Sequence, residues 1–467
     1  MFIKFIASVL VISASVSGQN MREDTLSFGA FGKVWTYRTS ATPSHVVLFI
    51  SGDGGWNLGV VDMARSLATL DALVVGVDIR AYLHRLQAES QPCLYPAGDM
   101  ELLSKFVQKT FGYDAYTPPV MVGYSSGATL VYATAVQAPS QTFAGVISMG
   151  FCPDLPLSKP MCSEDLLRWT KSRDGSSFVF EPCAKLGVPW VVLHGLIDQV
   201  CDIAKTRQFV EQTSHARIVE LPKVGHGFSV QRNWLPQFRQ SFADLVSAGT
   251  KKTPKIAPAM TTDLPLIEVP STDSGGNTLA LILSGDGGWG NTEKGMSAML
   301  SDSGVAVVGW NSLDYFWKEQ TPEQLALDMS QVLNVYSNRW NTDRYVLIGY
   351  SFGADVLPFA INRLPDSLRK RVEMLVLLGP SHYAEFEFHL SGWLGLSKGS
   401  QKYATIPEIE KLGKIWTICS YGSGETDQIC TELPPENTVV LRREGGHRVK
   451  EDYDEIVGSI MSALRKR

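Results

Sequence analysis

The amino-acid sequence predicts an α/β protein made of two tandem domains, each with a mostly parallel sheet flanked by helices. Three observations support this prediction. The chain has 467 residues, more than a single core usually accommodates. Several motifs occur twice in the same order, roughly 230 residues apart. Short, continuously apolar runs such as VVLFI and MLVLL alternate with longer helical patterns, which is typical of parallel strands buried on both faces.

The first residues have the layout of a secretory signal peptide. Lys4 precedes an apolar stretch, and small residues follow it. We expect cleavage between Ser15 and Gln19, which assigns residues 1–18 to the signal peptide. The apolar stretch is shorter than the ~20 residues that a bilayer requires. The sequence therefore predicts an exported protein that is soluble outside the cytoplasm.

The composition is that of a folded protein: 44% of the residues are hydrophobic and 19% are charged. The formal net charge of −5, with no long run of Lys or Arg, argues against nucleic acid as a partner. No Cys/His cluster has the spacing of zinc ligands, and no cofactor motif is present, so we expect neither a metal nor a cofactor.

Four motifs repeat in register, which indicates a duplication. The pairs are SGDGGW at 51–56 and 284–289, GYSSGA at 123–128 with GYSFGA at 349–354, DQVC at 198–201 with DQIC at 427–430, and GH at 225–226 and 446–447. A stretch rich in Lys, Thr and Pro without apolar periodicity separates the copies. The predicted domains are residues 22–248 and 266–467, joined by a linker over 249–265.

Each copy contains six strand candidates. In the first copy they are His45–Ile50, Leu73–Asp78, Val120–Tyr124, Phe143–Met149, Trp190–Leu193 and Arg217–Leu221. In the second they are Leu279–Leu283, Val305–Trp310, Tyr345–Gly349, Val372–Leu378, Lys414–Cys419 and Thr438–Leu441. The stretches between them carry helical patterns, so a doubly wound sheet is expected twice.

The G-x-S-x-G motifs lie between a predicted strand and a predicted helix. This context places Ser125 and Ser351 at sharp strand-to-helix turns, where glycines make room for a strained backbone. A serine hydroxyl needs a base and an orienting carboxylate to become a nucleophile. The order Ser, acid, His along each copy is that of α/β-hydrolases, so each domain is predicted to have that fold.

The acid and the histidine follow the last two predicted strands of each copy. In the first copy they are Asp198 and His226, with Asp202 a weaker candidate for the acid. In the second copy they are Asp427 and His447, and Glu425 is a rival acid there. The repeated DQ[V/I]C motif favours Asp198 and Asp427.

The SGDGGW motif follows the first strongly apolar strand, where α/β-hydrolases place a loop that donates to the oxyanion. The residues whose backbone N–H groups we expect in the oxyanion holes are Asp53, Gly54 and Ser126 in the first copy, and Asp286, Gly287 and Phe352 in the second. A carboxylate beside an oxyanion is unfavourable unless it meets a cation. We therefore hypothesise that Asp53 and Asp286 bind a cationic substrate group, such as the ammonium of an aminoacyl ester.

Seven cysteines in an exported protein suggest disulfides, and the odd number leaves at least one thiol. The locally feasible pairs are Cys152–Cys162 and Cys419–Cys430, although sequence alone does not fix the connectivity. Five other histidines, His84, His194, His215, His382 and His389, have no counterpart in the other copy, so we assign them structural or surface roles.

The signal peptide, the paired SGDGGW motifs and the GYSSGA and GYSFGAD elbows resemble the bacterial AcvB/VirJ virulence-protein family. The resemblance covers essentially the whole mature chain, and the second half is similar to stand-alone VirJ. It implies a periplasmic esterase that hydrolyses lysyl- or alanyl-phosphatidylglycerol, with Ser351 as the nucleophile. Either half, or both, can hold the active triad on this evidence, and the preferred amino acid and the oligomeric state stay open.

Two other functions are compatible with the sequence: an esterase for small soluble substrates, and a non-enzymatic periplasmic adaptor or chaperone for virulence-factor secretion that contacts a secretion system. The expected partner is an aminoacyl-phospholipid substrate at the membrane surface. The aromatic segments 315–317 and 386–393 are candidates for lipid contact. Packing in the core or in a lid is the alternative for both.

Overall fold

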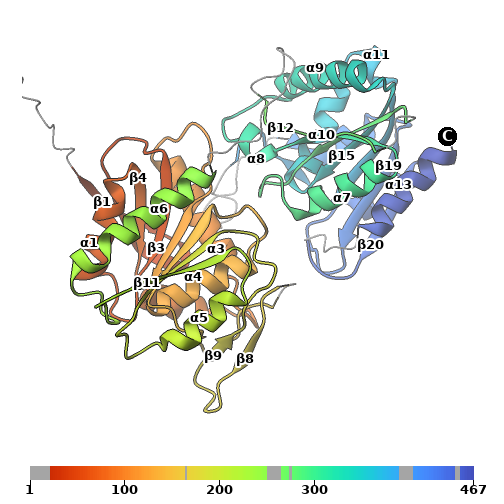
Figure 1. The fold of residues 1–467 in the computed structure, drawn as a ribbon. Coiled ribbons are helices and arrows are strands. Elements are labelled where there is room, and N and C mark those ends of the chain that lie inside the picture. Colours follow the sequence, from red (N-terminus) through yellow and green to blue (C-terminus); the bar gives the residue numbers. More distant parts are fainter. Residues whose placement is uncertain are drawn as a thin grey trace, which may run out of the picture.

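The computed structural model describes residues 21–163, 166–249, 264–272, 276–388, 403–447 and 453–466. These residues form two lobes, each with a central sheet covered by helices (Figure 1). The predicted signal peptide and nearly all of the predicted linker lie outside the described residues. No helix within the described ranges is long and apolar enough to cross a membrane.

The first lobe contains an eight-stranded sheet in the order β1-β2-β4-β3-β5-β6-β10-β11. Its strands are β1 (Arg22–Phe28), β2 (Gly32–Arg38), β3 (His45–Ile50), β4 (Ala72–Val77), β5 (Val120–Tyr124), β6 (Gly145–Met149), β10 (Trp190–Gly195) and β11 (Ala216–Leu221). β1 and β2 pair antiparallel, and β2 also pairs antiparallel with β4. The six strands from β4 to β11 are parallel, as the sequence predicts for this half.

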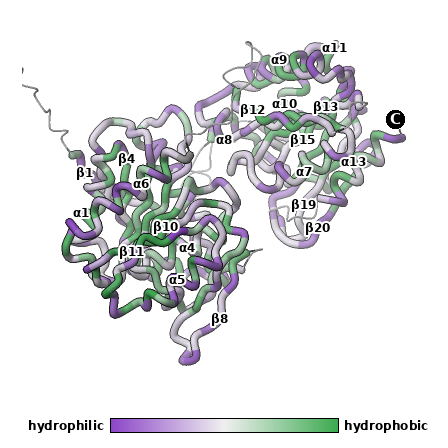
Figure 2. Tube along the Cα trace, in the orientation of Figure 1, coloured by the Kyte–Doolittle hydropathy of each residue, from purple (hydrophilic) through white to green (hydrophobic). Residues whose placement is uncertain are grey.

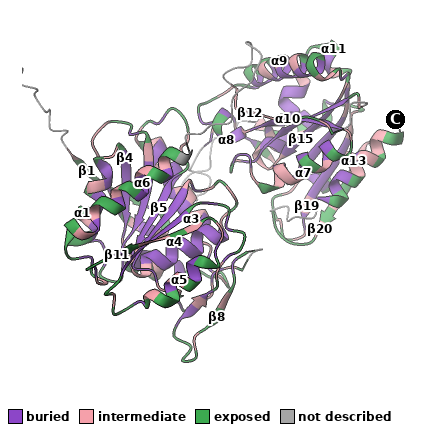
Figure 3. Ribbon diagram, viewed as in Figure 1, coloured by how far each residue is buried: buried purple, intermediate pink, exposed green. Residues whose placement is uncertain are grey.

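Helices cover both faces of this sheet. They are α1 (Leu58–Ala68), α2 (Ile79–Ala88), α3 (Pro96–Thr110), α4 (Ser126–Gln137), α5 (Ile203–Glu211) and α6 (Leu235–Gly249). Apolar side chains of α1 and α6 pack on one face, and those of α3, α4 and α5 pack on the other. The central strands are therefore buried on both sides, which explains their uninterrupted apolar sequence (Figures 2 and 3).

The second lobe repeats this arrangement with seven strands in the order β12-β14-β13-β15-β16-β19-β20. They are β12 (Leu266–Val269), β13 (Thr278–Leu283), β14 (Ala306–Trp310), β15 (Arg344–Tyr350), β16 (Val372–Leu378), β19 (Trp416–Gly422) and β20 (Thr438–Arg443). Only the edge strand β12 pairs antiparallel within this sheet. Both lobes thus have the α/β-hydrolase fold.

The helices of the second lobe are α7 (Asn291–Asp302), α8 (Ser312–Tyr315), α9 (Pro322–Trp340), α10 (Phe352–Asn362), α11 (Asp366–Arg369), α12 (Thr405–Glu410) and α13 (Asp454–Lys466). α7 and α13 cover one face of the sheet, and α9 and α10 cover the other. Small antiparallel sheets lie beside each lobe, formed by β7 (Asp154–Leu155), β8 (Trp169–Lys171) and β9 (Phe178–Phe180), and by β17 (Tyr383–Ala384) and β18 (Tyr403–Ala404).

Three disulfides cross-link the lobes internally: Cys93–Cys162, Cys152–Cys201 and Cys419–Cys430. The predicted pair Cys419–Cys430 is confirmed, whereas the pair Cys152–Cys162 is wrong. The loop after β6 brings Cys152 to the loop after β10, far along the chain from it, and proximity in sequence did not reveal this. Cys183 is a buried free thiol.

Candidate active sites

The first candidate site lies at the carboxyl ends of β5, β10 and β11. Ser125 Oγ lies 2.9 Å from His226 Nε2, and His226 Nδ1 lies 2.9 Å from Asp198 Oδ2. The structure therefore brings together the three residues that the sequence predicts. Their connectivity is that of a nucleophile, a general base and the acid that orients the base.

Ser125 occupies a strained turn between β5 and α4, with φ 56° and ψ −124°. Glycines on either side make this turn feasible. A Cβ on Gly123 would lie 2.1 Å from the Gly127 carbonyl oxygen, and a Cβ on Gly127 would lie 2.4 Å from the Ser51 carbonyl oxygen. The turn raises the hydroxyl above the sheet, as a nucleophile elbow requires.

The Asp198 carboxylate is held as an anion. Its side chain is fully buried, which alone would raise its pKa, but the backbone N–H of Cys201, the His226 ring and the backbone N–H of Val200 together lower that pKa. The weaker candidate Asp202 instead caps α5 by accepting from Ala204 N and Lys205 N. Asp198 therefore contacts His226, whereas Asp202 has a structural position at the start of α5.

The second candidate site has the same layout in the second lobe. Ser351 has φ 51° and ψ −118° between β15 and α10, and its Oγ lies 2.8 Å from His447 Nε2. His447 Nδ1 lies 2.8 Å from Glu425 Oε2. A complete Ser–His–acid arrangement is therefore present in both lobes, and in the second lobe the acid is a glutamate.

The prediction of Asp427 as the partner of His447 is wrong. The Glu425 side chain is 6% exposed and also accepts from the backbone N–H of Gly422, whereas Asp427 is 73% exposed and its Oδ1 lies 2.6 Å from His382 Nδ1. The loop after β19 is two residues longer than its counterpart, so the DQ[V/I]C repeat is out of register with the acid.

A different repeat would have identified the acid. Asp198 follows Gly195 at the end of β10 by three residues, and Glu425 follows Gly422 at the end of β19 by three residues. Both glycines lie against the backbone of the histidine loop, where a Cβ would be 2.1 Å from a carbonyl oxygen. Counting from the glycine at the strand end, and not from the cysteine, aligns the two acids.

His382 is a polar neighbour of the second site that the sequence assigned only a structural or surface role. Its ring lies between Asp427 and Glu432, with Nε2 3.0 Å from Glu432 Oε1. The hydrogen bond with Asp427 raises the pKa of His382, although partial burial opposes the shift. Asp427 thus belongs to an ion-pair cluster beside the triad. His389 lies outside the described residues.

The SGDGGW loops approach both serines closely. A Cβ on Gly52 would lie 2.9 Å from Ser125 Cβ, and a Cβ on Gly285 would lie 3.4 Å from Ser351 Cβ. Ser126 and Phe352 are the first residues of α4 and α10, so their N–H groups have no acceptor within the helix. The residues predicted for the oxyanion holes, Asp53, Gly54 and Ser126 with Asp286, Gly287 and Phe352, therefore all lie on segments that border a serine.

The two loop aspartates have different surroundings. Asp53 is exposed, and its Oδ1 accepts from Ser126 Oγ at 2.7 Å. Asp286 is half-buried; burial raises its pKa, while the Lys105 ammonium opposes the shift. Lys105 belongs to α3 of the other lobe, so a cation of the chain itself already lies near Asp286.

Asp355 is a further acid at the second site that the sequence did not single out. It accepts from Ser381 N at 2.6 Å and from Ser381 Oγ at 2.9 Å. Burial, together with nearby Asp427 and Asp286, raises the pKa of Asp355 to about 8 in spite of these donors. It is the last residue of the GYSFGAD motif, and Thr129 stands at its place in the first lobe.

Among the described residues, Asp198, Cys201 and His226 form the one group close enough together to suggest a metal site. Cys201 is in a disulfide with Cys152, so it has no thiolate to offer a metal. The other two residues face each other within the triad. This group is therefore explained by the hydrolase geometry.

The aromatic segments proposed for lipid contact are packed inside the protein. Tyr315, Phe316 and Trp317 are 8%, 1% and 1% exposed, and Phe386 and Phe388 are each 4% exposed. The described part of both segments thus belongs to the core, which corrects the lipid-contact prediction. Residues 389–393 lie outside the described part of the chain.

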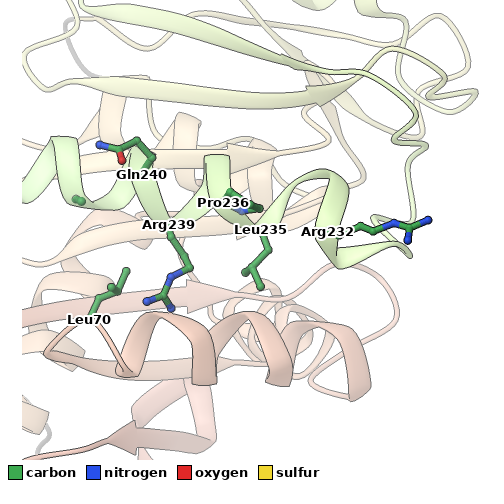
Figure 4. A pocket seen from close by; sticks show the side chains of 7 residues that line it. Leu70, Arg232, Leu235, Pro236, Arg239 and Gln240 are labelled. Carbon is green, nitrogen blue, oxygen red and sulfur yellow. The ribbon is translucent and has the colours of Figure 1, made fainter.

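A hollow of about 500 Å³ lies elsewhere, between α6 and the end of α1 (Figure 4). Its lining residues are Leu70, Arg232, Leu235, Pro236, Arg239, Gln240 and Ala243. None of them belongs to either Ser–His–acid arrangement, so this hollow is separate from the candidate sites.

Several solved structures are similar to one half of the chain. A predicted CIB-like hydrolase from Thermoplasma acidophilum is 17% identical, with a TM-score of 0.32, over 50% of this chain and 100% of its own. The esterase domain of a Rhodothermus marinus protein is 15% identical, with a TM-score of 0.33, over 48% and 97%. Est1E from Butyrivibrio proteoclasticus is 13% identical, with a TM-score of 0.32, over 48% and 99%. A comparison with curated proteins found no match.

A family model described as "Bacterial virulence protein (VirJ)" matches residues 44–152 and 277–467. The first region contains the SGDGGW loop and the elbow of the first lobe, and the second contains the whole Ser351 site. The matched regions together make up more than half of the chain. The protein therefore belongs to the VirJ family of bacterial virulence proteins.

Proposed function

We propose that the protein is a periplasmic serine esterase that hydrolyses lysyl- or alanyl-phosphatidylglycerol to phosphatidylglycerol and the free amino acid. The observation that carries this proposal is the Ser351–His447–Glu425 arrangement, with its serine beside a glycine-rich loop. The equivalent arrangement at Ser125 supports the same chemistry in the first lobe.

The reaction follows from this geometry. Ser351 Oγ attacks the ester carbonyl carbon while His447 Nε2 takes the hydroxyl proton, and the resulting oxyanion accepts from backbone N–H groups of the SGDGGW loop and of Phe352. His447 then gives the proton to the departing lipid hydroxyl. Water, deprotonated by the same ring, hydrolyses the acyl-enzyme and releases the amino acid. Glu425 orients the ring and stabilises its charged form.

The preference for an aminoacyl ester rests on the charge around Ser351. Asp355 interacts electrostatically with both Asp286 and Asp427, and burial beside these two carboxylates raises its pKa to about 8, so negative charge is unfavourable in this region of the site. A substrate that carries an ammonium group would offset this charge. The aminoacyl group of the lipid supplies such an ammonium next to the scissile ester.

The location in the periplasm is supported by the disulfides. Three pairs involve six of the seven cysteines, and disulfides of this kind persist in oxidising compartments. The signal-like sequence at residues 1–18 agrees with export.

Release of lysine and alanine from the two lipids tests the proposal. Mature protein, Ser125→Ala, Ser351→Ala and the double variant are each incubated with lysyl- and alanyl-phosphatidylglycerol, and free amino acid is measured. We expect release by the wild type and by Ser125→Ala, with strong loss in Ser351→Ala. Hydrolysis of small soluble esters without lipid hydrolysis would indicate the soluble-substrate alternative. No hydrolysis and no labelling by a fluorophosphonate would favour the secretion adaptor.

A further inference from the structure

The two lobes meet where α3 of the first lobe contacts the SGDGGW loop of the second and Trp317, which follows α8. Lys105 on α3 is 3% exposed, and its Nζ donates to the Asp286 carbonyl oxygen at 3.0 Å. The ammonium is balanced by Glu101 Oε1 at 2.8 Å and lies 4.9 Å from the centre of the Phe388 ring. A buried lysine needs such partners, so its position at the lobe interface is well defined.

The carbonyl that Lys105 binds belongs to the peptide between Asp286 and Gly287. Gly287 is exposed, and a Cβ on it would meet nothing within 4 Å, so no packing holds this peptide beyond the turn that the Gly288 N–H closes by donating to the Gly285 carbonyl oxygen at 3.1 Å. Glycine also has the widest choice of backbone conformations. A hydrogen bond from Lys105 to the carbonyl fixes the peptide plane and thereby the direction of the Gly287 N–H.

The first lobe holds the matching loop in a different way. There Ser126, the residue after the nucleophile, donates its hydroxyl to the Asp53 carboxylate. The second lobe has Phe352 at that position, and its ring packs 4.9 Å from Phe316. The Ser351 site therefore lacks the hydrogen bond from a hydroxyl to the loop that the first lobe has. Lys105, from the other lobe, donates a hydrogen bond to this loop instead.

We infer that Lys105 is a positioning residue of the Ser351 site, and that the first lobe completes the oxyanion loop of the second. This inference rests on the proposed function, because it assigns Lys105 to that hydrolytic site. Lys105 acts through the loop peptide and does not contact the reacting atoms. Its removal should therefore lower turnover while substrate binding changes little.

The test uses Ser125→Ala as background, so that all hydrolysis comes from Ser351. In this background Lys105→Met, which keeps the apolar stem, should lower kcat for p-nitrophenyl acetate about tenfold with KM within about twofold. Lys109→Met is the matched control. Lys109 lies one turn further along α3 and also reaches the second lobe, where it contacts the Trp317 carbonyl and Glu387 at 3.1 Å. The kcat of the Lys109→Met variant should stay within about twofold of that of the Ser125→Ala background.

Hydrogen exchange of the backbone provides a second measurement that does not require activity. The segment 284–290 should exchange faster in Lys105→Met than in Lys109→Met. Unchanged or raised kcat in Lys105→Met, equal losses in both variants, or equal exchange in segment 284–290 would overturn the inference. If Ser125→Ala itself neither hydrolyses esters nor reacts with a fluorophosphonate, the proposed function of the Ser351 site fails, and exchange alone decides the role of Lys105.

Discussion

Single residues decide which carboxylate serves His447. Two acids only two positions apart follow β19, and both face a histidine: Glu425 faces His447 and Asp427 faces His382. The buried carboxylate next to the serine-bound ring has the geometry of a triad acid, whereas the exposed one is largely screened by solvent.

Replacing the triad acid should therefore have a far greater effect than replacing its neighbour. In the Ser125→Ala background, Glu425→Gln should lower kcat for a soluble ester by about 10³- to 10⁴-fold, because the ring loses its orientation and charge partner. Asp427→Asn should lower it by less than about threefold. Steady-state kinetics measure both, and a larger loss with Asp427→Asn would contradict the assignment.

The nucleophile elbows are elements with little tolerance for a side chain. Gly123 and Gly127 pack against backbone atoms in the first lobe, and Gly349 and Gly353 do so in the second. Because backbone atoms cannot move aside as a flexible side-chain end does, an added methyl group displaces the strand or the helix. The serine depends on this packing for its strained conformation.

Alanine at an elbow glycine should destabilise the fold, whereas alanine at an open helical glycine should not. Gly349→Ala places a Cβ 2.5 Å from Ala354 Cα and should cost about 2 kcal/mol or more in the free energy of unfolding. In Gly458→Ala, in α13, the new Cβ meets nothing within 4 Å, so this variant should raise the free energy of unfolding by roughly 0.5–1 kcal/mol. Urea unfolding measures both changes; equal stabilities of the two variants would show that the elbow is not tightly packed.

At the scale of the whole molecule, the lobes are joined by more than the linker. Trp317 of the second lobe is 1% exposed; its Nε1 donates to the Tyr113 carbonyl oxygen at 2.7 Å, and its ring lies 5.5 Å from that of Tyr116. Lys318 adds an ion pair to Asp114 at 2.6 Å. This contact keeps α3 against the Ser351 site.

Removing the Trp317 side chain should uncouple the lobes. Trp317→Ala leaves a cavity at the interface and should cost on the order of 3–5 kcal/mol. Each lobe has its own hydrophobic core. We therefore expect calorimetry to resolve two unfolding transitions in the variant, one for each lobe, that lie further apart in temperature than in the wild type. Trp340→Ala, at the end of α9, should lower stability of the second lobe without this separation. A single transition at the wild-type temperature in Trp317→Ala would exclude the interface as a stabilising contact.

Local sequence was sufficient for the central architecture. Uninterrupted apolar runs predicted the buried parallel strands, such as β3 and β16, because both faces of such a strand are covered and its successive side chains are therefore all apolar. The antiparallel strands β1, β2 and β12 were not predicted, because partly exposed strands at or next to a sheet edge carry mixed polar sequences that resemble loops. The glycine, serine and histidine motifs identified the two Ser–His pairs that the structure brings together, Ser125 with His226 and Ser351 with His447.

The sequence by itself determined the duplicated α/β fold, Ser125, Asp198 and His226, and the pair Ser351 and His447. These features follow from short patterns whose physical requirements are local: a strained turn, a buried strand, a residue at a strand end. Only the tertiary structure decided Glu425 over Asp427, the Cys152–Cys201 bridge and the reach of Lys105 to the second site. Each of these depends on distances between segments that are far apart in the chain. Loop lengths and the packing of the two lobes determine these distances, and no local sequence pattern predicts them.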